Sequence, residues 1–370
     1  MNMNKFHKAH WVLRQIAMMK RRVKYPFRLL FSDFLNQESY FPEMAEQRKS
    51  KFQIFWDQFI NIMKNGDLNY HYFTYGFDIK GFRNMNEYFD EADFLWRLEQ
   101  YNRWESAYDY RCILRDKRLF ATLLSTYKCN TPPIILDTLS SRYEEMLYQL
   151  VRTKGTYFAK PIDGLCGRGA FIIIVNENDC LIDGAKYTKE QVPSILSERF
   201  GKKDYIIQPF IVQHKVLSNI YSKSINTMRL LTAIDKKTKK ACAVSAVLRI
   251  GANGNVVDNF DKGGVSVGIN LSTGKLAKYG LFKYGRGTKA EKHPNTNVVF
   301  ENIEIPYFKE ALNQALELHE TMSEIPLIGW DVAFTESGPS FIEGNDNMDI
   351  ALCQQADGGL KAKIEYLTNI

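Results

Sequence analysis

The segment that most constrains the fold is residues 329–345, which read GWDVAFTESGPSFIEGN. Two apolar runs flank a serine–glycine pair, a pattern typical of a tight turn between antiparallel strands. Such a turn folds the chain back so that Asp331 lies roughly opposite Glu343. Because strand side chains alternate between faces, Glu343 and Asn345 should point the same way. The segment therefore predicts a hairpin with three oxygen-bearing side chains on one side.

These three side chains suit a hard divalent cation. Two carboxylates and an amide carbonyl match the ligands that hold Mg²⁺ beside nucleotide phosphates, and they suit neither zinc nor iron. The six cysteines are scattered and form no CxxC pair, which also argues against zinc. A surface hairpin with solvated acids is the alternative interpretation.

The composition indicates a soluble globular protein of two or three domains, with 370 residues, 45% hydrophobic and 25% charged. No apolar run approaches the ~20 residues that cross a bilayer. The polar, basic start predicts no export signal, so we expect a cytoplasmic location and reduced cysteines.

The net charge of +7 is concentrated at the start of the chain, where eight basic residues precede the first acidic residue, Asp33. Val12, Ile16, Met19 and Val23 fall on one helical face. A basic amphipathic helix can bind an anionic membrane surface, which would make residues 1–30 a peripheral membrane contact. It can equally pack its apolar face on its own protein, and both interpretations stay open. No nucleic-acid-binding signature accompanies the helix, so we expect no nucleic acid partner.

The chain divides into three regions of different texture. Residues 1–110 are helix-rich and aromatic. Residues 111–223 alternate short strands and helices around a Gly-rich loop, and residues 224–370 contain longer strands and the hairpin. Two α+β lobes would leave a cleft at their junction, where ligand sites are common.

The Gly-rich loop, residues 160–169, reads KPIDGLCGRG between two apolar strands. Glycines let backbone amides approach phosphate oxygens, and Lys160 and Arg168 can add charge. The loop is neither a Walker A motif nor a dinucleotide fingerprint. A flexible hairpin loop is the alternative interpretation.

Arg229 lies inside a predicted apolar strand and shares a face with Thr227. A buried guanidinium needs a partner, and a phosphate or a carboxylate can bind it bidentately. A purely structural ion pair is the alternative. A strand at residues 205–211 has an edge that can read an adenine base, although His214 beside it has the pattern of a structural residue.

Together these motifs resemble the ATP-grasp superfamily and, within it, the sugar-transfer-associated ATP-grasp proteins found with capsule and exopolysaccharide biosynthesis. The resemblance covers about residues 111–355. It rests on Asp116-Lys117, Lys160-Pro161 with the Gly-rich loop, Gln208-Pro-Phe-Ile211, Ile225-Asn-Thr-Met-Arg229 and the hairpin. It implies an α+β ATP-grasp fold, two α+β lobes clamping ATP, with a helix-rich aromatic N-terminal region.

The resemblance also implies roles for individual residues. The nucleotide would be bound by Lys117, Lys160, Gly164, Gly167, Arg168, Gly169, Gln208, Phe210, Ile211 and His214. Gln208 stands where family members often carry an acid. The catalytic residues would be Arg229, Lys262 and Asn226, and Arg229 matches the residue expected near the transferred phosphate. The metal ligands would be Asp331, Glu343 and Asn345.

Most ATP-grasp enzymes activate a carboxylate as an acyl phosphate, which an amine then attacks. Phosphoryl transfer of this kind needs Mg²⁺ and positive charge more than a covalent nucleophile. The resemblance therefore implies an ATP- and Mg²⁺-dependent ligase that joins a small-molecule or glycan-linked carboxylate to an amine in surface polysaccharide biosynthesis. A kinase acting on a sugar hydroxyl and a non-catalytic assembly protein are the alternatives.

Overall fold

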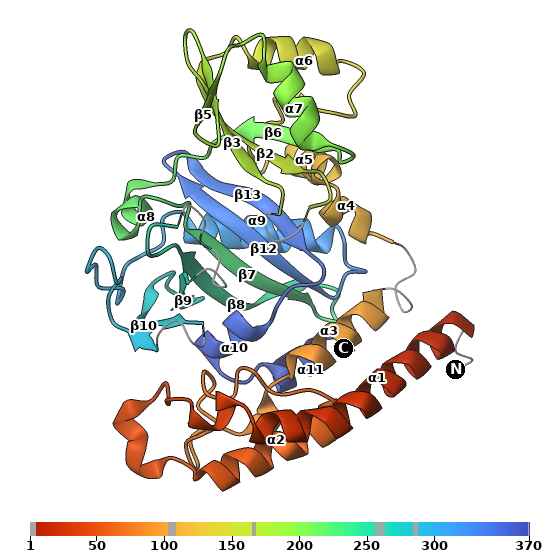
Figure 1. The fold of residues 1–370 in the computed structure, drawn as a ribbon, viewed down its shortest axis with the longest axis vertical. Helices are drawn as coiled ribbons and strands as arrows, with labels where there is room; N and C mark the ends of the chain where they lie inside the picture. Colours follow the sequence, from red (N-terminus) through yellow and green to blue (C-terminus); the bar gives the residue numbers. More distant parts are fainter. Residues whose placement is uncertain are drawn as a thin grey trace.

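The computed structural model describes residues 5–102, 109–164, 168–255, 258, 263–283, 288–368 and 370. A small lobe built on one sheet lies above a larger sheet, and the N-terminal helices lie below it (Figure 1). The fold is the mixed α+β arrangement that we expected, and the helix-rich, aromatic N-terminal region is confirmed.

The N-terminal region is held together by aromatic packing and capped helices. Ser50 and Gln53 form a reciprocal capping box at the start of α2, and Gly66 ends that helix in a left-handed conformation. Asp90 caps α3 by accepting from the amides of Ala92 and Asp93. The helices are α1 (Lys5–Leu30), η1 (Asp33–Asn36), η2 (Pro42–Gln47), α2 (Lys51–Asn65), η3 (Met85–Glu87) and α3 (Glu91–Gln100).

The small lobe is a sheet in the order β1-β6-β2-β3-β4-β5, with every neighbouring pair antiparallel. Its core contains Tyr157 and Ala159, so the alternate residues Phe158 and Lys160 of β2 face the larger sheet. Its elements are β1 (Leu136–Asp137), α6 (Tyr143–Leu150), β2 (Gly155–Pro161), β3 (Phe171–Val175), β4 (Cys180–Ile182), β5 (Ala185–Tyr187), α7 (Val192–Phe200) and β6 (Tyr205–Pro209).

The large sheet has the order β11-β10-β9-β8-β7-β12-β13, again with antiparallel neighbours. Its strands are β7 (Thr227–Ile234), β8 (Ala241–Ile250), β9 (Val265–Ile269), β10 (Leu276–Phe282), β11 (Lys289–Ala290), β12 (Leu327–Thr335) and β13 (Gly338–Asn345). The helices around it are α4 (Arg111–Arg115), α5 (Lys117–Thr126), α8 (Lys215–Ile220), α9 (Phe308–Glu320), α10 (Ala351–Asp357) and α11 (Lys361–Leu367).

The central strand β7 is buried along its whole length because both of its faces are covered. Met228 and Leu230 pack with α9 in one core, whereas Leu231 and Ala233 pack with α3, α10 and α11 in another. At the N-terminal end of β7 the same face carries Thr227, which points toward the small lobe. The fold thus leaves one end of the large sheet for a site between the lobes.

Packing groups α4 and α5 with the large sheet. Leu114, Phe120 and Leu124 belong to the same core as Trp330 and Phe341. The lobe boundary at residue 111 stays a prediction. It was placed where the residue pattern changes along the sequence, and side-chain packing groups the elements by a different criterion.

A buried polar chain lies inside the core under α9. Trp330 Nε1 donates to Thr232 Oγ1 over 2.8 Å, and Thr232 Oγ1 lies 2.7 Å from His319 Nδ1. His319 Nε2 lies 2.8 Å from the carbonyl oxygen of Ile325, which only accepts, so Nε2 carries the proton. Burial lowers the pKa of His319 to about 4. The chain therefore depends on a neutral imidazole.

Candidate functional site

A cavity of about 220 Å³ lies between the two sheets. Its walls come from β2 and β6 of the small lobe and from β7, β8, β12 and β13 of the large sheet. The predicted site residues that line it are Lys117, Lys160, Gly164, Arg168, Gln208, Phe210, Ile211, Asp331 and Glu343. The structure thus brings residues more than 200 positions apart to one cleft.

The β12–β13 hairpin forms as the sequence predicts. Asp331 pairs directly with Glu343, and Gly329 pairs with Asn345. A bulge follows, because the next paired residues are Val332 and Phe341. Asn345 Nδ2 donates to Glu343 Oε1 and to the Gly329 carbonyl, both over 3.3 Å. Asn345 therefore supports Glu343 from outside the cavity lining.

Asp331 is buried and held by two guanidinium groups. Arg229 Nε donates to Oδ1 over 2.6 Å and its Nη2 to Oδ2 over 3.2 Å. Arg249 Nη2 lies 3.0 Å from Oδ2. Burial alone would raise the pKa of Asp331, but the two guanidinium groups lower it to about 2. The carboxylate is therefore ionised at neutral pH.

Glu343 lies in the opposite electrostatic situation. Burial raises its pKa first, and the neighbouring Asp331 carboxylate raises it further, while Lys160 acts in the opposite direction. The two carboxylates are adjacent, but only Asp331 is paired with guanidinium groups. A cation bound between them would remove the repulsion between their charges. Both side chains offer oxygen ligands. Among the described residues, no group of three or more His, Cys, Asp or Glu side chains could hold a metal ion.

Sequence reasoning missed a polar group beside the hairpin. Arg249 donates to the Thr227 hydroxyl from Nε over 3.0 Å and from Nη2 over 2.6 Å. Asp258 accepts from the Thr227 amide over 3.1 Å and from its hydroxyl. Arg249 lies in an apolar strand exactly as Arg229 does, so the same signal was available for it. Asp258 begins a polar, glycine-closed segment whose pattern predicts a bulge or a substrate loop, but the sequence does not predict its contact with Thr227.

The two predicted lysines lie on the small-lobe side of the cavity. Lys117 begins α5 after the Asp116 cap, and its Nζ donates to the carbonyls of Ile162 and Gly164 over 3.1 and 2.8 Å. Burial lowers the pKa of Lys117, and it lowers that of Lys160 to about 8. Lys117 thereby fixes the start of the Gly-rich loop, and Lys160 keeps most of its charge at neutral pH.

A family model described as sugar-transfer associated ATP-grasp matches residues 97–369. This chain belongs to the sugar-transfer associated ATP-grasp family. The match includes both lobes, the last turn of α3 and the C-terminal helices, and it extends beyond the segment on which the resemblance was based. A search of curated proteins found no match.

Solved structures that resemble this ATP-grasp protein are distant from it. The D-alanine–D-alanine ligase of Helicobacter pylori is 12% identical, with a TM-score of 0.41, over 69% of this chain and 57% of that chain. The VanG D-Ala:D-Ser ligase of Enterococcus faecalis is 12% identical, with a TM-score of 0.40, over 69% and 62%. This chain therefore spans less than two thirds of either ligase. D-cycloserine synthetase DcsG is 12% identical, with a TM-score of 0.39, over 75% and 79%.

Gln208, Phe210 and Ile211 line the small-lobe side of the cleft. Gln208 Nε2 donates to the Pro132 carbonyl over 2.6 Å, which leaves its Oε1 as an acceptor. An amide oxygen can accept a hydrogen bond as a carboxylate oxygen does. Phe210 and Ile211 follow it along the cavity wall.

Three predicted residues have structural contacts away from the cavity lining. His214 caps α8 by accepting from the Val216 amide over 3.1 Å, and its Nε2 lies 3.3 Å from Glu336. Asn226 is fully buried and donates to the carbonyls of Leu217 and Tyr221. Arg229 lies behind Asp331. Their roles toward a substrate stay predictions.

The Gly-rich loop is described at its two ends. Gly169 has φ of +79°, and a Cβ there would lie 2.9 Å from the Tyr205 hydroxyl, which itself donates to the Gly169 carbonyl. A glycine is therefore required at that position. The predicted residues Gly167 and Lys262 lie outside the described residues.

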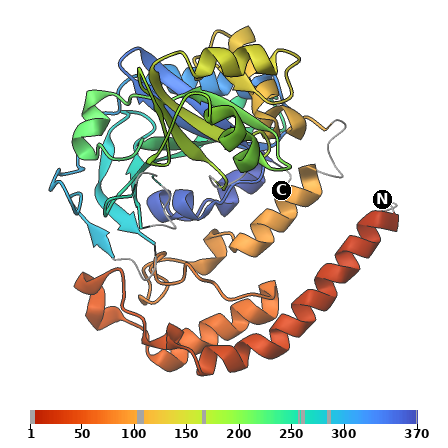
Figure 2. The ribbon, with the colours of Figure 1, turned by 45° about the horizontal axis from the view of Figure 1, so that its top comes forward.

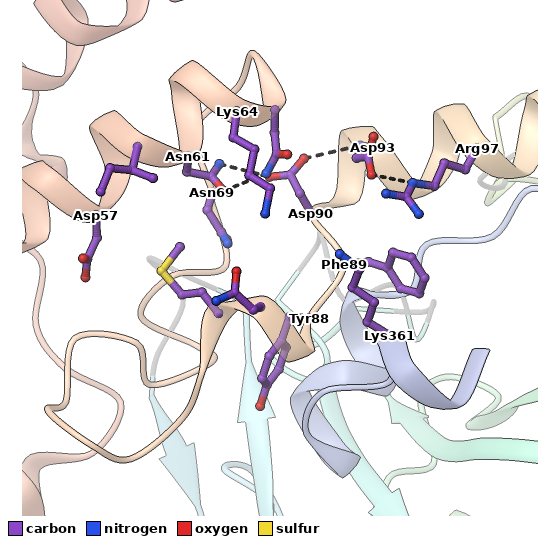
Figure 3. Close-up of a pocket in the computed structure, with 14 residues that line it drawn as sticks. Asp57, Asn61, Lys64, Asn69, Tyr88, Phe89, Asp90, Asp93, Arg97 and Lys361 are labelled. Atoms are coloured by element: carbon purple, nitrogen blue, oxygen red, sulfur yellow. Dashed lines mark hydrogen bonds and ion pairs between the residues drawn. The ribbon is translucent and has the colours of Figure 1, made fainter. Parts of the chain in front are cut away.

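A second cavity of about 220 Å³ lies between α2, α3 and α11 (Figure 3). Its carboxylates are already used within the protein: Asp90 caps α3 and accepts from Asn61, and Asp93 pairs with Arg97. Burial raises the pKa of Asp90 to about 6. This cavity joins the N-terminal region to the C-terminal helix, and we assign no ligand to it.

Proposed function

We propose that this protein is an ATP- and Mg²⁺-dependent carboxylate–amine ligase that acts in surface polysaccharide biosynthesis. The observation that carries the proposal is the paired Asp331 and Glu343 at the floor of a cleft whose walls carry Lys117, Lys160 and Arg249. The substrates would be a sugar acid, an amino sugar or an amino acid, free or linked to a glycan.

The cations of the cleft would bind the triphosphate. Lys160 and Arg168 line the cavity on the lobe that carries the Gly-rich loop, and Arg249 lines it on the large sheet. Charge on a transferring phosphoryl group spreads over its oxygens, so cations fixed on both sides stabilise it throughout the transfer. Gln208 would accept from the adenine amine.

The hairpin fits a magnesium site. Glu343 and Asp331 would be the carboxylate ligands, and the Asn345 amide would orient Glu343 or contribute its carbonyl oxygen. When bound, Mg²⁺ supplies neutralisation of the phosphate charge. Glu343, whose ionised form is disfavoured without a nearby cation, is the residue that gains most from this partner.

Arg249 would then bind a phosphate and Asp331 at the same time, and Arg229 would hold Asp331 in place. Each holds an oxygen of Asp331 in the described structure. Since Arg249 lines the cavity and carries a further donor, it can bind a phosphate oxygen while still orienting the carboxylate.

The second substrate would enter where the N-terminal region approaches the hairpin. Asp349 is accessible to solvent, and the Glu91 carboxylate lies near it. His71 Nε2 lies 3.2 Å from Glu91. These carboxylates suit an amine. The amine nitrogen would attack the acyl carbon, inorganic phosphate would leave with the electron pair of the broken C–O bond, and the amine would lose a proton to a neighbouring base.

Product analysis tests the reaction. The protein is incubated with ATP, Mg²⁺ and panels of sugar acids, amino sugars and amino acids, and both ADP and the organic product are measured. ADP, inorganic phosphate and an amide in equal amounts are expected. ADP with a stable phosphate ester identifies a kinase instead, and no ADP with any pair argues for a non-catalytic assembly role.

A further inference from the structure

Helix α1 packs on the protein through its mixed polar side. Arg14 lies over the Trp96 ring at 4.4 Å and pairs with Asp93 at 3.2 Å. Leu29 is fully buried, and Met18 lies close against Gly66 at the end of α2. The long aliphatic stems of arginines allow such a side to pack while the charge finds a partner.

The apolar stripe of α1 faces away from the protein. Its members recur every three or four residues and are each 44–69% exposed: Val12, Ile16, Met19, Val23, Phe27 and Leu30. This spacing puts them on one face over about 27 Å of helix. The interpretation in which this face packs on its own protein is therefore contradicted. In both views α1 lies at the outer edge of the molecule (Figure 2).

A row of cations runs beside the stripe. Lys20, Lys24 and Arg28 are spaced by four residues, are exposed, and make no salt bridge within the part of the chain that the structure describes. No acidic residue precedes Asp33 in the sequence. An apolar face edged by unpaired cations is complementary to lipid acyl chains below anionic headgroups.

We propose that α1 binds an anionic membrane surface, lying in its plane with the stripe at the boundary between headgroups and acyl chains. Among the described residues, no helix is long and apolar enough to cross a membrane, so the contact is peripheral. A second copy of the chain is a poorer occupant of this face, because pairing two such helices would bring cationic rows together without acidic partners.

Vesicle co-sedimentation of the full chain tests the proposal. Phosphatidylcholine vesicles with and without phosphatidylserine are compared at low and high salt. We expect binding only with the anionic lipid, decreasing as salt rises. Each basic residue near such a surface contributes about 1 kcal/mol, so the combined variant Lys20→Gln, Lys24→Gln and Arg28→Gln should bind on the order of 100-fold more weakly.

Matched variants separate the contribution of the basic residues of α1 from that of its apolar stripe and from the net charge of the protein. Ile16→Ser with Val23→Ser removes apolar area and should also weaken binding, whereas Lys202→Gln, Lys203→Gln and Lys223→Gln remove equal charge from other exposed sites and should not. Thermal melting checks that each variant is folded.

The proposal is overturned if the intact protein stays in solution at low salt with anionic vesicles, or if the control loses binding as strongly as the α1 variant. Sedimentation velocity without lipid identifies the competing occupant. A dimer that the Ile16 and Val23 substitutions dissociate, with no lipid binding, would assign the stripe to a second copy.

Discussion

The two carboxylates of the hairpin should respond oppositely to neutralisation. Asp331→Asn leaves Arg229 and Arg249 buried without their shared counter-ion. Removing one partner of a buried ion pair costs about 3–5 kcal/mol, because the remaining charge is uncompensated. Glu343→Gln removes a carboxylate whose ionised form burial and Asp331 already disfavour. We therefore expect this variant to be as stable as the wild type at neutral pH, or more stable.

The pH dependence follows from the sign of the Glu343 shift. Its folded-state pKa lies above the ordinary 4.5, so the folded protein binds more protons than the unfolded chain between 4.5 and the raised value. The stability contributed by Glu343 is therefore present below this window and is lost as pH rises through it. Glu343→Gln should abolish that part of the pH dependence.

Urea denaturation and ADP release distinguish the two effects. Both substitutions should remove most Mg²⁺-dependent ATP turnover, and Mg²⁺ should raise the melting temperature of the wild type more than that of Glu343→Gln. Equal stability of Asp331→Asn and the wild type would refute the counter-ion role. If Glu343→Gln destabilises the protein as much as Asp331→Asn does, the claim that the folded protein stabilises the ionised form of Asp331 but not that of Glu343 is refuted.

Other expected outcomes concern the nucleotide, the core and the second substrate. Lys117→Ala and Lys160→Ala should each weaken binding of a non-hydrolysable ATP analogue by about 1–3 kcal/mol in calorimetric titration, and wild-type affinity should fall as pH rises through about 8, where Lys160 loses its proton. The depressed pKa of His319 should cost about 3 kcal/mol of unfolding free energy as pH falls from 6.5 to 4, because the unfolded chain binds the proton there; His319→Gln should lack this loss in acid titrations followed by urea melts. Glu91→Gln and Asp349→Asn should raise KM for the amine several-fold while leaving nucleotide affinity unchanged; a loss of nucleotide affinity instead would place these residues elsewhere.

The hairpin was predictable because its information is local. A turn signal and strand alternation fix which residues face each other, and the register of Asp331 with Glu343 follows directly. The partner of Arg229 was not predictable in the same way. It was expected to be a phosphate or a carboxylate, and the carboxylate is Asp331 itself, because β12 pairs with β7 across 102 positions of sequence.

Helix α1 shows a different limit of sequence reasoning. Periodicity correctly predicted which residues share a face, but it did not tell which face packs. Arg14 and Met18 pack on the protein while Val23 is exposed, since an arginine stem and a local acidic partner can replace an apolar contact.

The contact between Phe89 and Gln354 has a consequence for how this chain can be divided. Gln354 accepts from the Phe89 amide and donates to its carbonyl, over 2.8 and 3.1 Å, and it also donates to the Tyr75 hydroxyl. The Gln354 side chain thus satisfies both backbone groups of Phe89, as a neighbouring β-strand would, although the two residues are 265 positions apart.

A fragment that begins at Asp116-Lys117, the first ATP-grasp motif, would lack Phe89 and Tyr75. The side-chain amide of Gln354 would then be buried in the apolar core without these partners. The same fragment would lack Phe89 and Phe94, which pack against Ile364 and the other C-terminal residues of that core. The N-terminal region and the C-terminal helices therefore stabilise each other. Exchanging the ATP-grasp lobes between relatives should succeed only when both ends of the chain are taken from the same parent.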